Sequence, residues 1–268
     1  MTEAFNLAKQ KELSLLEKYY NKFNEEHRLT TRHGRVEFST SMHFIHKYIP
    51  FGEKIRILDI GAGTGRYSVA LKEEGHDVTA VEKVARNLKV LEDKHSGVNC
   101  WPGDARNLSF LPDSSFDLTL LFGPLYHLHT QEEMLDAFKE ARRVTKKDGI
   151  ILASYVMNEY SVITYCFKQK HIREVMEKNA LTSDWHTKAS EDELYTYLRL
   201  EDIEELNKKS GLTRLEIFAA DGPADYMRQE LNAMDEEEFS FFLQYHLSTC
   251  QRPELLGASS HVVDVLKN

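Results

Sequence analysis

The stretch from Ile57 to Ser68 constrains the fold more than any other part of the sequence. Apolar residues lead up to Asp59, glycines follow at positions 61, 63 and 65, and apolar residues with helical spacing come next. This order predicts a buried strand, a tight turn and the start of a helix. An ordinary turn of this kind needs one glycine. Three glycines therefore indicate that the backbone comes close to a bound ligand.

The spacing of these glycines narrows the class of ligand. A dinucleotide fingerprint reads Gly-x-Gly-x-x-Gly, whereas Arg66 stands here where the third glycine would fall. The turn also lacks the Gly-x-x-x-x-Gly-Lys-Ser/Thr pattern of a P-loop. The spacing thus disfavours NAD as the ligand and excludes a P-loop.

Strand and helix patterns alternate along the middle of the chain. The expected strands cover residues 54–59, 77–81, 98–101, 116–122, 150–155, 213–219 and 261–266. Helical patterns separate the first five strands, and Thr130 with Glu133 predicts a capping box at one helix start. We therefore expect an α/β fold with a doubly wound, mostly parallel sheet of seven strands, which binds ligands at the carboxyl ends of its strands.

Other segments fall outside this alternation. Residues 1–24 predict a helix, and a second helix ends at Pro50, with a polar link over residues 24–35 between them. Residues 156–200 hold scattered aromatic side chains and no clear strand, and residues 222–256 include a helical stripe. We expect both segments to be helical insertions, after strands five and six, in a single domain that spans residues 1–268.

Composition limits the classes of partner. The net charge of −9 disfavours nonspecific binding to nucleic acid. The cysteines at 100, 166 and 250 are far apart and form no Cys-x-x-Cys pair, which favours a reducing compartment without disulfides or a cysteine zinc site. No apolar run could cross a bilayer, and the first residues do not read as a signal peptide. We expect a cytoplasmic protein without a membrane partner, and the oligomeric state stays open.

Five stretches resemble, in order, motifs of the class I S-adenosylmethionine-dependent methyltransferases. They are the glycine motif at 59–65, the acidic Glu82, Gly103-Asp104-Ala105, FDLTLLFGPLYHL at 116–128, and ARRVTKKDGIILA at 141–153. The most specific parts are the glycine motif and Gly-Pro-Leu-Tyr-His-Leu, the latter typical of a bacterial subgroup acting on small molecules. The resemblance covers residues 54–155 and implies a Rossmann-like fold, S-adenosylmethionine as the cofactor, and a last strand running antiparallel between strands five and six.

The resemblance also implies which residues meet the cofactor. Glu82 would hold the ribose hydroxyls, Asp104 the exocyclic amine of adenine, and Arg66 the cofactor's carboxylate. The full set is Asp59, Gly61, Ala62, Gly63, Gly65, Arg66, Glu82, Lys83, Gly103, Asp104, Ala105, Phe122 and Tyr20. Residues 1–50 would form a helical lid over the core at 54–155, with Tyr19, Tyr20, Arg28 and Arg35 as lid candidates, and the insertions would cap the substrate.

Two residues after the fourth expected strand are candidates for catalysis. Tyr126 and His127 stand where the reactive group of the family lies. His127 could accept a proton near neutral pH, and Tyr126 could orient the substrate. The alternative is that both residues only pack or help to hold the cofactor. No metal-ligand constellation is visible in the sequence, so we expect no metal.

The expected activity is methyl transfer from S-adenosylmethionine to a small molecule (EC 2.1.1.-). The segment 123–127 lacks the Asn/Asp-Pro-Pro-Tyr of enzymes that methylate nucleobases or glutamine. The aromatic insertions are typical of walls around an apolar pocket. The alternatives are an RNA or protein methyltransferase, a binding protein that keeps the cofactor pocket without turnover, and, less favoured, an NAD-dependent oxidoreductase. The sequence identifies neither the acceptor nor the atom that is methylated.

Overall fold

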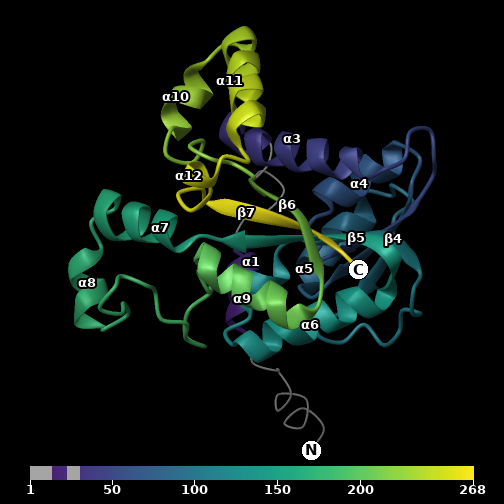
Figure 1. Ribbon diagram of the computed structural model, residues 1–268, viewed down its shortest axis with the longest axis horizontal. Coiled ribbons are helices and arrows are strands. Elements are labelled where there is room, and N and C mark those ends of the chain that lie inside the picture. Colours follow the sequence, from purple (N-terminus) through teal and green to yellow (C-terminus); the bar gives the residue numbers. More distant parts are fainter. Residues whose placement is uncertain (1–13, 23–30) are drawn as a thin grey trace, which may run out of the picture.

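A computed structural model describes residues 14–22 and 31–268. One seven-stranded sheet runs through the middle of the molecule, with helices on both of its faces (Figure 1). Its strand order is β3-β2-β1-β4-β5-β7-β6. The strands are β1 (Arg56–Ile60), β2 (Asp77–Glu82), β3 (Asn99–Pro102), β4 (Phe116–Leu121), β5 (Thr145–Val156), β6 (Thr213–Ala219) and β7 (His261–Lys267). This arrangement confirms the expected doubly wound sheet.

The direction of the strands confirms the expected topology as well. The pairs β1–β2, β1–β4, β2–β3 and β4–β5 are parallel. The strand β7 is antiparallel to both of its neighbours and lies between β5 and β6. The carboxyl ends of the parallel strands therefore meet at one edge, where ligands bind in folds of this kind.

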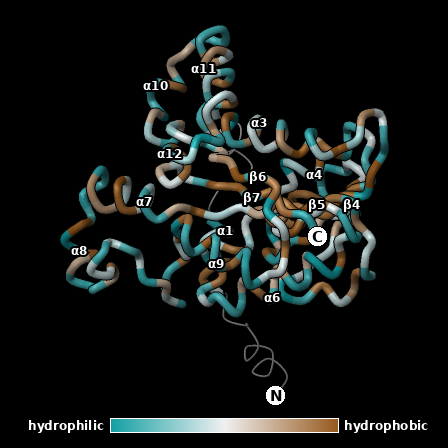
Figure 2. Tube along the Cα trace, viewed as in Figure 1, coloured by the Kyte–Doolittle hydropathy of each residue, from teal (hydrophilic) through white to brown (hydrophobic). Residues whose placement is uncertain are grey.

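Burial explains why these segments become strands and helices. The central strands are apolar on both faces, and Figure 2 shows the hydrophobic colour concentrated in the strands. Each covering helix buries one apolar stripe; in α6 (Gln131–Val144), Met134, Phe138 and Ala141 are buried. The predicted capping box of Thr130 and Glu133 begins this helix. The other helices of the core are α4 (Arg66–Glu73), α5 (Ala85–Asp93) and α9 (Leu200–Ser210).

Two expected boundaries were wrong. The strand β5 begins at Thr145 instead of residue 150, because the chain passes Asp148 with φ of 64° and continues beside β4 through an irregular register. The helix α3 (Arg32–Lys47) begins inside the expected polar link, where the Thr31 side chain accepts a hydrogen bond from the Gly34 amide. Of the first expected helix, the described part is α1 (Leu15–Tyr20). Arg28 and residues 1–13 lie outside the described residues.

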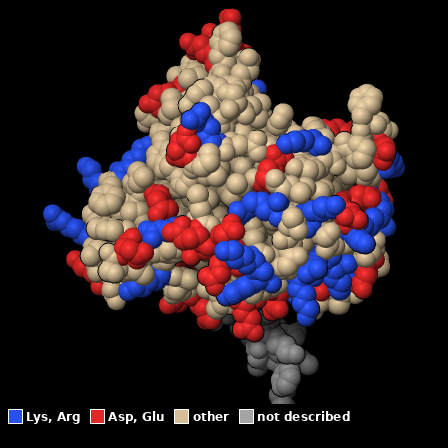
Figure 3. Space-filling view, viewed as in Figure 1, with Lys and Arg blue, Asp and Glu red and all other residues tan. Residues whose placement is uncertain are grey.

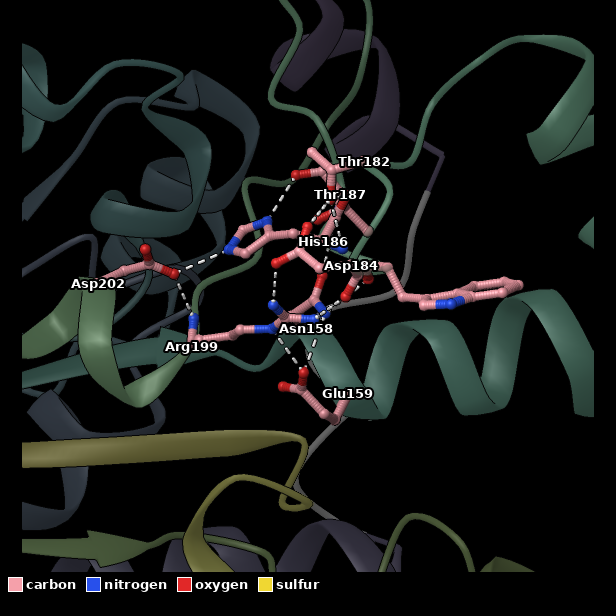
Figure 4. Close-up of polar contacts among 9 residues, drawn as sticks. Asn158, Glu159, Thr182, Asp184, His186, Thr187, Arg199 and Asp202 are labelled. Carbon is pink, nitrogen blue, oxygen red and sulfur yellow. Dashed lines mark hydrogen bonds and ion pairs between the residues drawn. The ribbon is translucent and has the colours of Figure 1, made fainter.

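The insertion after β5 is helical only in its first part. It contains α7 (Asn158–Ser161), the π-helical η3 (Val162–Lys168) and α8 (Ile172–Glu177). Residues 178–199 are largely irregular, so the expected helical structure was wrong there. Side chains hold this part in place (Figure 4): Arg199 binds Glu159 at 2.7 Å and Asp184 at 2.8 Å, and His186 Nε2 lies 2.8 Å from an oxygen of Asp202. This segment is held by the side-chain hydrogen bonds and ion pairs drawn in Figure 4, and not by the regular backbone hydrogen bonds of a helix.

The insertion after β6 packs on the N-terminal helix α3. It consists of α10 (Arg228–Ala233), α11 (Glu236–Thr249) and α12 (Pro253–Leu256). Val36 of α3, Leu231 of α10 and Phe239 of α11 form a separate buried cluster. In Figure 1, α10 and α11 form a lobe above the sheet, and α3 runs across the base of this lobe and contacts both helices.

Within the described ranges, no helix combines the length and the apolar composition that crossing a bilayer requires. Cys100, Cys166 and Cys250 are free thiols.

Candidate functional site

A cavity opens at the carboxyl ends of the parallel strands. It encloses about 1230 Å³ of empty space when the open solvent at its mouth is included. The cavity brings together almost every predicted site residue. Its lining includes Tyr20, Asp59, Gly61, Ala62, Gly63, Arg66, Glu82, Lys83, Gly103, Asp104, Ala105, Phe122, Tyr126 and His127.

The glycine turn adopts the backbone that its sequence predicts. Gly61, Gly63 and Gly65 have φ of 79°, 56° and 84°, a region that favours glycine. A Cβ on Gly61 would lie 2.5 Å from Cδ of Pro124. Gly65 is the predicted cofactor residue that the cavity lining does not include. A Cβ there would lie 2.2 Å from the buried Leu91, so its close approach is to the protein core.

Asp59 is the next-to-last residue of β1 and lines the cavity. Its side chain is buried, and the Ser68 hydroxyl donates to Oδ2 at 2.6 Å. Burial raises the pKa of Asp59 to about 6, although the hydrogen bonds from Ser68 act in the opposite direction. A cationic group of a ligand at this point would stabilise the ionised carboxylate.

Glu82 ends the neighbouring strand and joins two segments of the site. Its two carboxylate oxygens accept hydrogen bonds from the amides of Gly63 and Val84, both at 2.7 Å. A carboxylate oxygen has two lone pairs, so it can accept more than one hydrogen bond. The carboxylate is therefore fixed against the glycine turn and lines the cavity in that position.

Asp104 follows β3 and lies between two cations. The Lys83 ammonium is 2.9 Å from Oδ2, and Arg106 donates to both carboxylate oxygens at 2.8 and 3.0 Å. Burial alone would raise the pKa of Asp104, but the hydrogen bonds from Arg106 and Lys83 outweigh it and hold the pKa below its usual range. Asp104 is thus ionised at neutral pH and can accept a hydrogen bond.

His127 lies in a short 3-10 helix, η2 (Pro124–His127), with both ring nitrogens engaged. Nδ1 lies 3.0 Å from the carbonyl oxygen of Leu194, and Nε2 lies 3.1 Å from the hydroxyl of Tyr20. Nδ1 must donate to that carbonyl, which leaves Nε2 as the acceptor for Tyr20. Burial lowers the pKa of His127 to about 4. The neutral ring connects α1 to the cavity wall, and this geometry favours positioning over proton transfer.

Several lining residues escaped the sequence-based prediction. They are Leu16, Glu37, Ser41, Thr64, Asn87, Ser154, Ala220 and Val263. Asn87 is 4% exposed, and its amide makes no hydrogen bond to another described residue. Glu37 and Ser41 are four residues apart on α3, beside its apolar stripe. That spacing was the available signal, because it places two polar side chains on one face of a helix.

Neither insertion contributes a lining residue to this cavity within the described chain. The expectation that insertion aromatics line the pocket was therefore wrong for this cavity. Tyr195 reaches it only indirectly, because its ring lies 5.1 Å from that of His127 and 5.8 Å from that of Tyr126. The aromatic side chains of the insertions pack largely on one another, as Phe167 and Trp185 do.

Comparison of the sequence with known proteins identifies relatives of the domain that contains this cavity. The profile of a methyltransferase domain matches residues 58–153. These residues thus have the sequence pattern of a methyltransferase domain. A demethylmenaquinone methyltransferase of Renibacterium salmoninarum is 33% identical over 145 residues, which cover 53% of this chain and 56% of that protein. A malonyl-[acyl-carrier protein] O-methyltransferase of Erwinia pyrifoliae is 34% identical over 105 residues, which cover 38% of each chain.

A solved structure extends the likeness to the whole fold. The S-adenosylmethionine-dependent methyltransferase of Thermotoga maritima superposes with a TM-score of 0.56 at 20% identity and covers 94% of this chain and 97% of its own. At this identity the likeness concerns the fold. The chain spans about half of the length of these two curated relatives or less.

The cofactor of this class is S-adenosylmethionine. The functional groups that line the cavity match the polar groups of this cofactor. Asp59, Glu82 and Asp104 offer carboxylates to an ammonium group, a pair of ribose hydroxyls and an amine. The amide of Asn87, which has no hydrogen-bond partner in the described chain, adds a donor and an acceptor to the lining of the same cavity.

Proposed function

We propose that the protein transfers a methyl group from S-adenosylmethionine to a small-molecule acceptor. One observation carries the proposal: three carboxylates, Asp59, Glu82 and Asp104, follow or end three adjacent parallel strands around one cavity beside a glycine turn. When bound, the cofactor supplies an electrophilic methyl group on a sulfonium centre.

The side chains of the cavity would bind the cofactor, orient the acceptor and exclude water from the reaction. Asp59, Glu82 and Asp104 would bind the cofactor's ammonium, ribose and adenine. Tyr20, held by His127, would close α1 over the cavity and exclude water. Tyr126 lines the cavity next to His127 and would orient the acceptor. This assignment gives His127 a positioning role, consistent with its lowered pKa.

The enclosed shape of the site supports a small acceptor. Helices α1 and α3 contribute Leu16, Tyr20, Glu37 and Ser41 to the walls, so a polymer would have to displace them. The distribution of surface charge also supports a small acceptor. Acidic and basic side chains are interspersed on the face in Figure 3, and the lobe of α10 and α11 is tan with red at its tip. A nucleic acid needs a broad basic face.

The acceptor does not follow from the relatives, because their names give demethylmenaquinone in one and malonyl-[acyl-carrier protein] in the other. An RNA or protein acceptor remains the second candidate, and a cofactor-binding protein without turnover the third. These three alternatives share the same cofactor and differ only in where the methyl group goes.

A two-stage experiment tests the proposal. S-adenosylmethionine and S-adenosylhomocysteine should raise the melting temperature of the purified protein, whereas NAD and NADP should not. Cofactor carrying a labelled methyl group is then added to a cell lysate divided into a small-molecule filtrate, RNA and protein. The label should enter the filtrate. Label confined to RNA or protein would contradict the small acceptor, and tight cofactor binding without transfer would favour the binding protein.

A further inference from the structure

Asn87 is a polar side chain in the wall of the cavity. It lies in the first turn of α5, and only 4% of its surface is exposed. Its amide makes no hydrogen bond to any other residue that the structure describes. The amide is also not among the described polar atoms that are fully buried without a partner, and the residue lines the cavity, so a molecule there can reach it. Asn87 thus offers the cavity a donor and an acceptor that the described chain does not use.

The way α5 begins explains why this amide has no partner within its own helix. Val84 is the N-cap, and Asn87 is the third residue of the helix. In a capping box, the side chain at that third position accepts a hydrogen bond from the N-cap amide. Here Oε1 of Glu82 accepts that hydrogen bond instead, at 2.7 Å. The Asn87 side chain is therefore not required for capping.

Other hydrogen-bond donors of the same lining are engaged with the protein. The Gly63 amide donates to Oε2 of Glu82 at 2.7 Å, and the Lys83 ammonium lies 2.9 Å from Oδ2 of Asp104. The carboxylates of Glu82 and Asp104, when ionised, only accept hydrogen bonds. A ligand that offered only hydrogens to this wall would leave the NH2 group of Asn87 unpaired in a largely buried site, which is unfavourable. The ligand should therefore also present an acceptor.

The adenosine part of the cofactor has acceptors of this kind. In the proposed arrangement, Glu82 binds the ribose hydroxyls and Asp104 binds the exocyclic amine. The ring nitrogens N1, N3 and N7 of adenine then remain, and all three are acceptors. N1 and N7 flank the exocyclic amine, whereas N3 lies on the ribose side of the base. Asn87 belongs to the helix that begins directly after Glu82 and packs on β2 and β3, so it lies toward the ribose side.

We propose that the NH2 group of Asn87 donates a hydrogen bond to N3 of the cofactor's adenine. This inference rests on the proposed function and adds to it a residue that determines cofactor specificity. Asp104 binds the amine at one end of the base, and Asn87 binds the ring nitrogen at the other. The two contacts together select adenine, because hypoxanthine lacks the amine and guanine carries an amino group beside N3 that would collide with the Asn87 amide.

Titration calorimetry on the full chain tests this contact. The ligands are S-adenosylhomocysteine and its 3-deaza and 7-deaza analogues, in each of which a C–H group replaces one ring nitrogen. Asn87→Leu keeps the approximate shape of the side chain without its polar atoms, and Asn87→Asp removes the NH2 donor but keeps acceptors. The matched control is Arg86→Ala, in the same turn of α5 but exposed and outside the cavity lining. The melting temperature without ligand shows whether each variant folds.

We expect the wild type to bind the 3-deaza analogue about 3- to 10-fold less tightly than S-adenosylhomocysteine, the effect of one neutral hydrogen bond. Asn87→Leu should bind S-adenosylhomocysteine with a similar loss and should no longer distinguish it from the 3-deaza analogue. Asn87→Asp should lose at least as much affinity, because a carboxylate cannot donate to N3, and Arg86→Ala should lose none. The loss caused by Asn87→Leu should be the same for the 7-deaza analogue as for S-adenosylhomocysteine.

Several outcomes would overturn the contact. Equal affinity of the wild type for S-adenosylhomocysteine and its 3-deaza analogue would do so without any variant. A 3-deaza penalty that persists in folded Asn87→Leu would show that another group binds N3, and a 7-deaza penalty that Asn87→Leu abolishes would assign the amide to N7 instead. In each case the wild type still binds S-adenosylhomocysteine, and the proposed function stands. If the wild type did not bind S-adenosylhomocysteine at all, the proposed function itself would fail.

Discussion

At the scale of single residues, the site depends on carboxylates in unequal surroundings. Asp59 is buried with one hydroxyl partner, Asp104 lies between Lys83 and Arg106, and Glu82 is bonded to two backbone amides. The same functional group therefore has a raised pKa in Asp59 and a lowered one in Asp104. Asp59 and Asp104 therefore change protonation state in different pH ranges.

Cofactor affinity should depend on pH through Asp59. Its folded-state pKa of about 6 lies above the unfolded value of about 3.9, so ionisation of Asp59 costs stability as pH rises through 6 in the free protein. Only the ionised form can pair with the ammonium of the cofactor. Calorimetry should therefore show that the affinity for S-adenosylhomocysteine rises from pH 5 to pH 7 and then levels. Asp59→Asn should bind weakly with little pH dependence, and Asp192→Asn should behave as the wild type.

Removal of the Glu82 carboxylate should weaken cofactor binding. We expect Glu82→Ala to cost about 1–3 kcal/mol of binding free energy, the range for leaving buried polar partners unpaired. Glu82→Gln, which keeps one carbonyl oxygen, should lose less, and Glu92→Ala on the exposed face of α5 should lose nothing. Titration calorimetry measures the affinities, and the melting temperature without ligand shows whether the glycine turn has survived. Unchanged affinity in a folded Glu82→Ala would place the ribose elsewhere.

At the scale of elements, the glycine turn joins ligand binding to core packing. Gly61 and Gly63 line the cavity, while Gly65 lies against Leu91 of α5. The motif predicted the turn from the sequence, but it could not tell which glycine serves the ligand and which serves the core. That distinction depends on α5, whose position the local sequence does not encode.

Gly65→Ala should destabilise the fold rather than the binding site alone. The substitution adds a Cβ 2.2 Å from a methyl group of Leu91, at φ of 84°. Gly52→Ala is the matched control, because its φ of 75° is similar and nothing lies within 4 Å of the added carbon. Chemical denaturation should show Gly65→Ala less stable than Gly52→Ala by roughly 1–3 kcal/mol, the range typical of overpacking. Equal losses in both variants would mean that Leu91 moves aside freely.

The first insertion should loosen above neutral pH. Burial alone would lower the pKa of His186, but hydrogen bonds to Asp202 and to the Thr187 carbonyl outweigh it and raise the pKa. Because this pKa is raised, the protonated ring stabilises the folded state fully below the unfolded pKa of about 6.5. This stabilisation is lost as pH rises through the folded-state pKa. Hydrogen exchange of residues 178–199, corrected for intrinsic rates, should therefore show less protection at pH 8 than at pH 6. His186→Gln should abolish this difference, whereas His43→Gln should keep it.

At the scale of the whole molecule, the sequence predicts the structural features that follow a regular local pattern. It does not predict those that depend on contacts between residues far apart in sequence. The alternation of strands and helices predicted the sheet, and the glycine motif with Glu82 and Asp104 predicted one side of the cavity. The side of the cavity at β5 and β7 escaped prediction because Ser154 and Val263, which line it, belong to segments far apart in sequence. The irregular run at 178–199 escaped it too, since the network of Figure 4 joins Arg199 to Glu159 and Asp184, which lie 40 and 15 positions away in sequence.

The antiparallel strand β7 also fixes an order of events during synthesis. On the ribosome, β5 leaves the exit tunnel long before its neighbour β7, and β6 emerges between them with no strand of the sheet to join. Until β7 inserts, both strands present unpaired edges of the kind that bind foreign strands. A nascent chain halted before His261 should therefore hold its first five strands as a parallel sheet and recruit chaperones at β5. The side of the cavity that Val263 lines is therefore the last part of the cavity to exist.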